Sequence, residues 1–183
     1  MSSTPREKLK AFHDQINRHL NEAEGYLMLN MPQRALEILE RRTDWATMQF
    51  EASLIAGEAL RGLERYGEAA KSLEVAAGLR PNEVQVAVSL AWCYKRTHRL
   101  AQAIATLEVA RAHHPQEALL YYNLACYWCI AGSRVKALHS LSQGLEIMPK
   151  LVSLIPDESD FDSLRDDPEF QRLIAVNKGL LEE

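Results

Sequence analysis

The strongest constraint on the fold of this chain is a group of residues that recur every 34 positions along its 183 residues. Of five such positions, one is always alanine, one always leucine, one small and one large, and the fifth is proline in three copies. The series are Ala35, Ala69, Ala103 and Ala137; Leu39, Leu73, Leu107 and Leu141; Ala23, Gly57, Ala91 and Ala125; Tyr26, Leu60, Tyr94 and Trp128; and Pro81, Pro115 and Pro149. A fixed period of this length indicates stacked copies of one supersecondary unit.

Helix pairing explains why these residue types recur. Two helices cross closely only where one side chain is tiny, as in the Gly57 and Ala69 series, and the large residues fill the space beside the crossing. The Leu73 series packs between successive units, and proline ends each second helix because it cannot continue one. No segment alternates as a strand would. We therefore expect helices over about 5–30, 32–42, 46–62, 66–79, 83–97, 100–113, 117–131 and 134–148.

Further residues within the second, third and fourth units make the pattern specific. Beside the five series, it is carried by Tyr66, Ala76, Leu90, Ala110, Tyr121, Leu124 and Gly132. Together these residues resemble the tetratricopeptide-repeat (TPR) family over residues 16–151. The resemblance implies an all-α fold, a right-handed TPR α-solenoid of antiparallel helix pairs with a C-terminal capping segment. The domains implied are an N-terminal helical extension at 1–15, four units at 16–49, 50–83, 84–117 and 118–151, and an acidic capping segment at 152–183.

The first unit departs from the family pattern at three places. Glu22 stands where an apolar residue is usual, Arg42 where a small one is usual, and Thr47 replaces the final proline. Terminal units of an array are often atypical because one of their faces meets water.

The last segment is not a fifth repeat. Residues 152–183 hold nine acids and three bases, and this ending resembles an extension that closes many bacterial TPR proteins. Asp167 is a suitable N-cap and Pro168 a suitable first residue for a final helix. We expect the apolar side chains of the segment to pack back on the repeats; they include Phe161, Leu164, Phe170 and Leu173.

Composition and charge exclude several classes of function. The formal net charge of −4 and the lack of a basic stripe argue against nucleic-acid binding. The N-terminal residues contain no apolar signal segment, and no apolar run is long enough to span a membrane. Three cysteines, Cys93, Cys126 and Cys129, do not form a disulfide framework and indicate reduced thiols in a cytoplasmic protein.

No motif for catalysis or for a cofactor is present. The chain lacks GxSxG, HExxH, a P-loop and GxGxxG, and its six histidines are scattered, so we expect no enzymatic activity and no cofactor. Cys126 and Cys129 are three residues apart on one helix face, and His139 or the His113–His114 pair are the candidates to join them as metal ligands. A structural zinc site needs two such pairs, so packed thiols and no metal are the expectation.

The resemblance to the TPR family implies a concave groove lined by the first helix of each unit. Trp92 and Tyr122 would be aromatic groups that the packing does not need, and rigid aromatics are frequent binding hot spots. The expected groove residues are Glu58, Arg61, Trp92, Lys95, Arg96, Tyr122, Asn123 and Cys126. These cations and aromatics predict a protein or peptide partner with an apolar anchor and acidic groups. The alternative is that one end of the chain fills the groove and Trp92 is simply buried.

Three functions are consistent with such a chain. The first is a non-catalytic scaffold or adaptor that binds a partner segment in the concave groove. The second is a chaperone of a secreted protein, like the small TPR chaperones of bacterial type III secretion. The third is a structural assembly subunit that self-associates. The sequence leaves the oligomeric state open.

Overall fold

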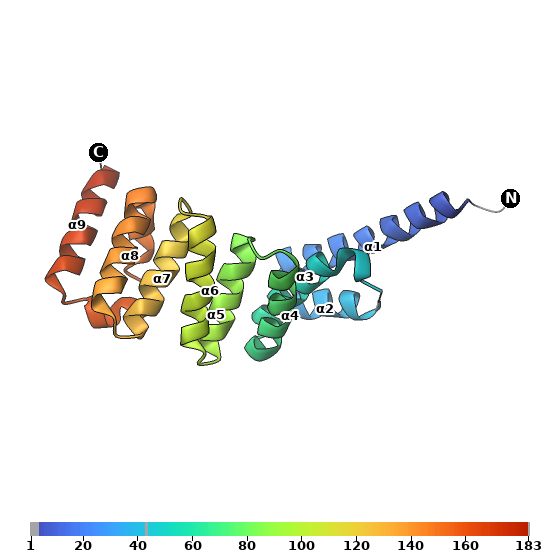
Figure 1. The fold of residues 1–183 in the computed structure, drawn as a ribbon, viewed down its shortest axis with the longest axis horizontal. Helices are drawn as coiled ribbons and strands as arrows, with labels where there is room; N and C mark the ends of the chain where they lie inside the picture. Colours follow the sequence, from blue (N-terminus) through green and yellow to red (C-terminus); the bar gives the residue numbers. More distant parts are fainter. Residues whose placement is uncertain (1–3, 43, 183) are drawn as a thin grey trace. The chain divides into compact units, whose positions relative to one another are not determined.

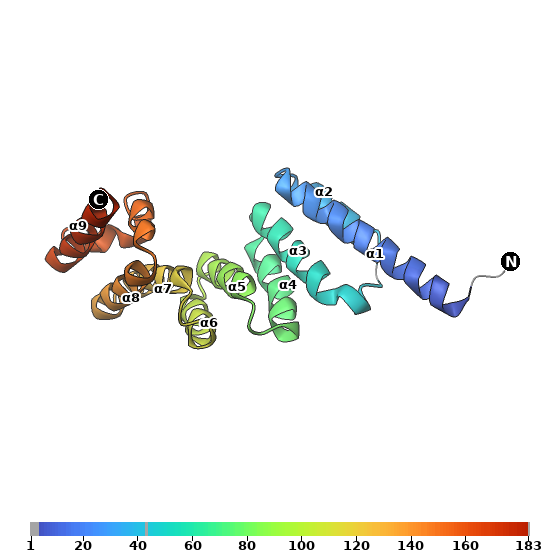
Figure 2. The ribbon, with the colours of Figure 1, turned by 90° about the horizontal axis from the view of Figure 1, so that it is seen from above.

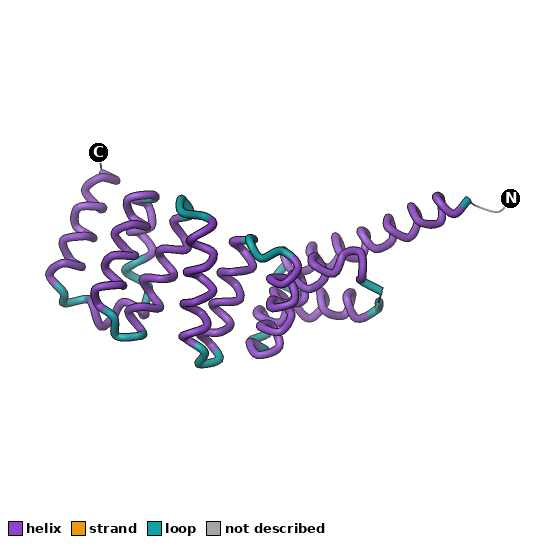
Figure 3. Tube along the Cα trace, viewed as in Figure 1, coloured by secondary structure: helices purple, strands orange, loops and turns teal. Residues whose placement is uncertain are grey.

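The computed structural model describes residues 4–42 and 44–182, and all regular structure within them is helical, with no strand (Figure 1; Figure 3). Contacts divide the chain into two compact units, Met1–Pro81 and Asn82–Glu183. These are called the first and the second unit from here on, as distinct from the four 34-residue repeats. No helix of the described part is long and apolar enough to cross a membrane.

The first unit contains four α-helices and one short 3₁₀ helix within its described residues. They are α1 (Pro5–Met28), α2 (Pro32–Glu40), η1 (Ala46–Met48), α3 (Gln49–Gly62) and α4 (Tyr66–Leu79). Thr4 and Glu7 form a capping box that starts α1, with the Glu7 N–H donating to Thr4 Oγ1 at 3.3 Å. α1 and α2 lie side by side, and α3 packs on both α2 and α4 (Figure 2).

The second unit continues the pairing and ends in a folded tail. Its helices are α5 (Val84–Arg96), α6 (Leu100–His113), α7 (Ala118–Ile130), α8 (Arg134–Ile147), η2 (Pro149–Leu154), η3 (Ser159–Leu164) and α9 (Pro168–Glu182). α6 packs between α5 and α7, and α8 lies against α7. The observed helices therefore confirm the expected ones to within two residues at nearly every end.

The turn inside each helix pair has the same conformation, again at an interval of 34 residues. Its left-handed residues are Asn30, Glu64, His98 and Gly132, with φ of 55°, 59°, 59° and 72°. In each turn the next residue donates its N–H to the carbonyl of the large residue that lies two positions before the end of the first helix, as when Arg99 bonds Tyr94 at 2.8 Å. This is the bond of a Schellman motif, and it supplies a partner to an otherwise orphaned carbonyl.

The repeated small residues lie at the helix crossings, as the sequence predicts. All four members of the Ala69 series are fully buried, and so are Leu73, Leu107 and Leu141 of the leucine series. At the crossing of α3 and α4, a Cβ built on Gly57 would lie 2.6 Å from Cγ of Leu73. Carbon atoms in ordinary contact are about 3.5–4.0 Å apart, so only glycine fits against Leu73 in this position.

The tail packs back on the second unit, which confirms that expectation. Asp167 Oδ1 accepts from the backbone N–H of Phe170 at 3.1 Å, so it is the N-cap of α9. Phe161 and Phe170 are buried with their ring centroids 5.5 Å apart. Arg134 of α8 donates to Asp167 from two of its nitrogens, which ties the start of α9 to the last repeat.

One expected helix is shorter than the sequence indicates. α2 ends at Glu40, two residues before the expected end at 42 and five residues before Trp45, which corresponds by the repeat to the last residue of α4. The indole Nε1 of Trp45 donates instead to the carbonyls of Leu39 (3.2 Å) and Arg42 (3.1 Å). An early end is stable here because this one side chain supplies partners to two carbonyls near the helix terminus.

Candidate partner-binding surfaces

The expected groove residues fall in both units. Glu58 and Arg61 lie on α3 of the first unit, where Arg61 Nη2 donates to Glu58 Oε2 at 2.6 Å. The other six lie on α5 and α7 of the second unit. The structure therefore brings together two groups of these residues, one in each unit.

Trp92 and Arg96 form a part-exposed pair on α5. They are four residues apart, so they lie on the same side of the helix, and the Arg96 guanidinium carbon is 5.6 Å from the centre of the Trp92 ring. A cation over an indole face at this distance is a favourable contact. Trp92 is neither fully buried nor fully exposed, which leaves part of a large rigid apolar surface in contact with solvent.

The tail covers the neighbouring face of α7. Phe161 of η3 meets Tyr122 edge to face, with ring centroids 5.7 Å apart and ring planes at 79°. Lys95 Nζ donates to Asp160 Oδ2 and forms an ion pair with it. Tyr122 and Cys126 are consequently buried. Of the two arrangements considered for the groove, occupation by one end of the chain is the one found over α7.

Cys126 lies among charged groups under this cover. Its Sγ and carboxylate oxygens of Glu158 and Asp160 all lie within 4.8 Å of one another, and no other such group of potential metal ligands occurs among the described residues. Burial first, and then the two carboxylates, raise the pKa of the Cys126 thiol far above its ordinary value of 9.0, whereas Lys95 opposes this shift. The thiol is therefore protonated near neutral pH, and the ammonium of Lys95 is the cation that balances Asp160.

Cys129 does not join Cys126 in a ligand set. Its Sγ lies 3.2 Å from Oγ of Ser163, within hydrogen-bonding distance for sulfur. This contact is a third point at which η3 meets the α7 face. The sequence pattern of two cysteines three apart thus marks a helix face that packs against the tail.

Asn123 and the ends of α7 remain outside the cover. Asn123 Nδ2 donates to the carbonyl of Leu119 one turn earlier, at 2.8 Å, and the residue is part-exposed. Leu119 and Ile130, at the two ends of the helix, are exposed. The uncovered part of this side of the second unit therefore runs along α5, with Asn123 and Leu119 beside it on α7.

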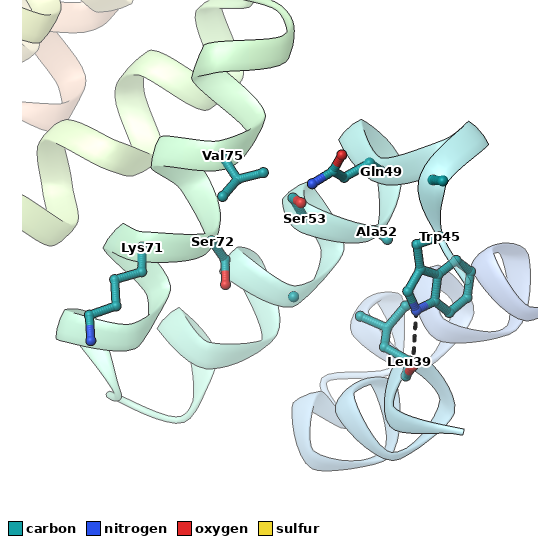
Figure 4. Close-up of a pocket in the computed structure, with 10 residues that line it drawn as sticks. Leu39, Trp45, Gln49, Ala52, Ser53, Lys71, Ser72 and Val75 are labelled. Atoms are coloured by element: carbon teal, nitrogen blue, oxygen red, sulfur yellow. Dashed lines mark hydrogen bonds between the residues drawn. The ribbon is translucent and has the colours of Figure 1, made fainter. Parts of the chain in front are cut away.

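The first unit carries a hollow that sequence reasoning missed (Figure 4). It has a volume of about 630 Å³, within the range of ligand pockets. Its lining residues are Leu39, Trp45, Ala46, Gln49, Ala52, Ser53, Ala56, Lys71, Ser72 and Val75. The small residues of α3 form its floor, and Figure 4 shows Trp45 and Val75 on opposite sides of it. Leu39 of α2 and Trp45, which follows α2, place the hollow beside the end of this helix.

Comparison with known proteins identifies the class. A family model described as tetratricopeptide repeat matches residues 60–125. The 34-residue period and the repeated turns of the structure extend the same repeat pattern on both sides of the matched residues. A search of curated proteins found no match.

Solved structures of MamA show the same fold. A crystal structure of MamA is 21% identical, covers 81% of this chain and 86% of its own, and has a TM-score of 0.68. The MamA RS-1 ArsTM double mutant is 19% identical, with 93% and 98% covered and a TM-score of 0.72. MamA 41-end from Desulfovibrio magneticus RS-1 is 19% identical, with 91% and 97% covered and a TM-score of 0.68. These likenesses establish a TPR helical solenoid fold.

Proposed function

We propose that this chain is a non-catalytic scaffold or adaptor that binds a segment of another protein along α5, with Trp92 as the apolar anchor. The observation that carries the proposal is the part-exposed Trp92 ring with the Arg96 guanidinium over it. TPR folds in general serve protein interaction, which supports the broader class. Partly exposed tryptophan and arginine side chains are the residue types most enriched among interface hot spots.

The chemistry of this patch indicates what the partner segment contains. The Trp92 ring offers a flat apolar surface to an aliphatic or aromatic side chain. Arg96 lies at the edge of the same patch and is exposed, so its guanidinium can also meet a carboxylate. Lys95 pairs with Asp160 of the tail, and we assign the carboxylate contact of this partner segment to Arg96 because it lies beside Trp92.

Affinity capture with paired variants tests the proposal. The wild-type chain is used as bait, and the captured partner is then titrated against Trp92→Ala combined with Arg96→Glu. Loss of a hot-spot tryptophan costs about 2 kcal/mol or more, so we expect the affinity to fall at least ~30-fold. The matched control is Val109→Ala on α6, a 58% exposed residue away from α5's aromatic patch. Equal affinity of the double variant and the control would rule out the Trp92 surface.

A further inference from the structure

The η3 segment lies on α5 and α7 in the way that a bound peptide would. It contributes one ion pair to Lys95, one aromatic contact to Tyr122 and one polar contact to Cys129. Three residues from two helices thus contact three residues of one six-residue segment. The carboxylate and the aromatic ring that they contact belong to adjacent residues, Asp160 and Phe161.

The segment is also held in shape by its own contacts. Arg165 donates to the carbonyls of Ile155 (3.1 Å), Pro156 (3.0 Å) and Glu158 (2.9 Å), which closes the turn that precedes η3. Glu158 Oε1 accepts from the backbone N–H of Asp160 at 3.1 Å and starts the 3₁₀ helix. A segment braced in this way loses less conformational freedom when it binds.

We propose that the α5–α7 face recognises protein segments in which a carboxylate is followed directly by an aromatic side chain, and that η3 occupies this face until such a segment replaces it. The inference rests on the protein-binding role in the proposed function, but not on the Trp92 surface, and it names the chemistry of one class of partner for the part of the α5–α7 face that η3 covers. Lys95 takes the carboxylate, and the edge of Tyr122 takes the ring. Phe170 of α9 is the second aromatic contact of the ring site, with its ring centroid 5.5 Å from that of Phe161.

The arrangement of the tail allows η3 to leave while α9 stays. α9 packs on η2 and α8, and its first turn is tied to α8 by Arg134 through Asp167 and Glu169. Apart from the Phe161–Phe170 contact, η3 packs mainly on α7. An incoming aromatic side chain would restore the contacts with Tyr122 and Phe170 that Phe161 gives up.

Tethering sets the size of the effect. A segment joined to its site by a short linker has an effective concentration of about 1 mM. If both make equal contacts, competition by η3 weakens the apparent affinity by the ratio of this effective concentration to the Kd of the free peptide. For a peptide whose Kd at the released face is about 10 µM or lower, binding to the wild-type chain should be at least about 100-fold weaker than binding to a chain whose η3 has been released.

A labelled peptide with the sequence of residues 155–166, IPDESDFDSLRD, provides the test. Its fluorescence anisotropy is measured against full-length wild type, Phe161→Ala and Asp160→Asn, each checked for native helical content by circular dichroism. We expect binding to Phe161→Ala at least about 100-fold tighter than to wild type, and an intermediate gain for Asp160→Asn, which disturbs packing less. Replacing the peptide's phenylalanine by alanine, or adding Lys95→Glu to the released chain, should abolish binding.

Two results would overturn the inference. One is failure of the peptide to bind either variant although both retain native helicity. The other is equal binding to the wild type and to the variants. Either result, together with partner capture that still depends on Trp92, would refute the inference and leave the proposed function standing. Capture that does not depend on Trp92, with peptide binding as expected, would refute the Trp92 surface instead.

Discussion

For the substitution Gly57→Ala at the crossing of α3 and α4, the sequence repeat and the structure predict changes of opposite sign in the free energy of unfolding. At this position the other three repeats have alanine, so the repeat alone predicts that Gly57→Ala is harmless or stabilising. Alanine also favours a helix interior over glycine by about 1 kcal/mol. The structure instead places Leu73 Cγ at 2.6 Å and Leu73 Cδ2 at 2.8 Å from the new Cβ.

The cost can be estimated from this overlap. Leu73 must move by roughly 1 Å to reach an ordinary contact distance of about 3.5–4.0 Å. It is fully buried, and overpacking of this kind costs about 1–3 kcal/mol. After the helix propensity gain of about 1 kcal/mol, the net expectation is a loss of about 1 kcal/mol in the free energy of unfolding.

A second glycine in the same unit gives the matched control. Gly25 lies in α1, and a Cβ there would meet nothing within 4 Å, so Gly25→Ala should stabilise by about 0.5–1 kcal/mol. The free energies of unfolding are measured by guanidinium chloride titration followed by far-UV circular dichroism. Opposite signs for the two substitutions are expected. A Gly57→Ala protein as stable as the wild type, or more stable, would refute the packing argument.

Two further expectations concern the ionisable groups of the second unit. Arg134 lowers the pKa of Asp167 from 3.8 to about 2, so the stabilisation from this carboxylate is complete above pH 4 and is lost as the pH falls toward 2. Asp167→Asn keeps a capping side chain without that titration, and its unfolding midpoint should change less than that of the wild type between pH 4 and pH 2; parallel pH profiles would contradict this. Burial and two carboxylates raise the pKa of the Cys126 thiol, so it should react with a disulfide reagent at pH 8 far more slowly in the folded than in the unfolded protein. Mass spectrometry of the modified peptides measures both rates, and equal rates would contradict the burial.

Local periodicity carries most of the fold, which is why the sequence predicts it well. Each helix, each left-handed turn and each crossing depends on residues within one 34-residue unit or its neighbour. The N-cap of the last helix is equally local, and Asp167 and Pro168 identify it. In such an array, residues one repeat apart occupy equivalent positions, so the interval in the sequence predicts which residues pack together.

Features that join distant or irregular parts of the chain were not predictable in the same way. Lys95 and Asp160 are 65 residues apart, and no period relates them. Charge complementarity between the cations of α5 and the acidic tail was the one signal for their pairing. The hollow of the first unit lies beside the early end of α2. The one sign of this irregularity in the sequence is Thr47, which stands where the other repeats have proline.

The binding residues proposed on α5 and α7 remain predictions of the sequence, refined by the structure. Trp92 and Arg96 keep the exposure that the proposal needs. Tyr122 and Cys126 are closed off by η3, so their part in any interaction requires the tail to move. The helical pattern gives which side of each helix a residue occupies, but it does not show whether another segment lies over it.

The folded tail also limits how this array can be lengthened by engineering. A new helix pair joined after α8 would need the face of α8 that η2 and α9 already cover. Such a fusion would have to delete residues from Pro149 onward, including the Arg134 tether to Asp167. A duplicated helix pair inserted between α6 and α7 avoids this conflict, because α7, α8 and the tail that covers them then stay together unchanged.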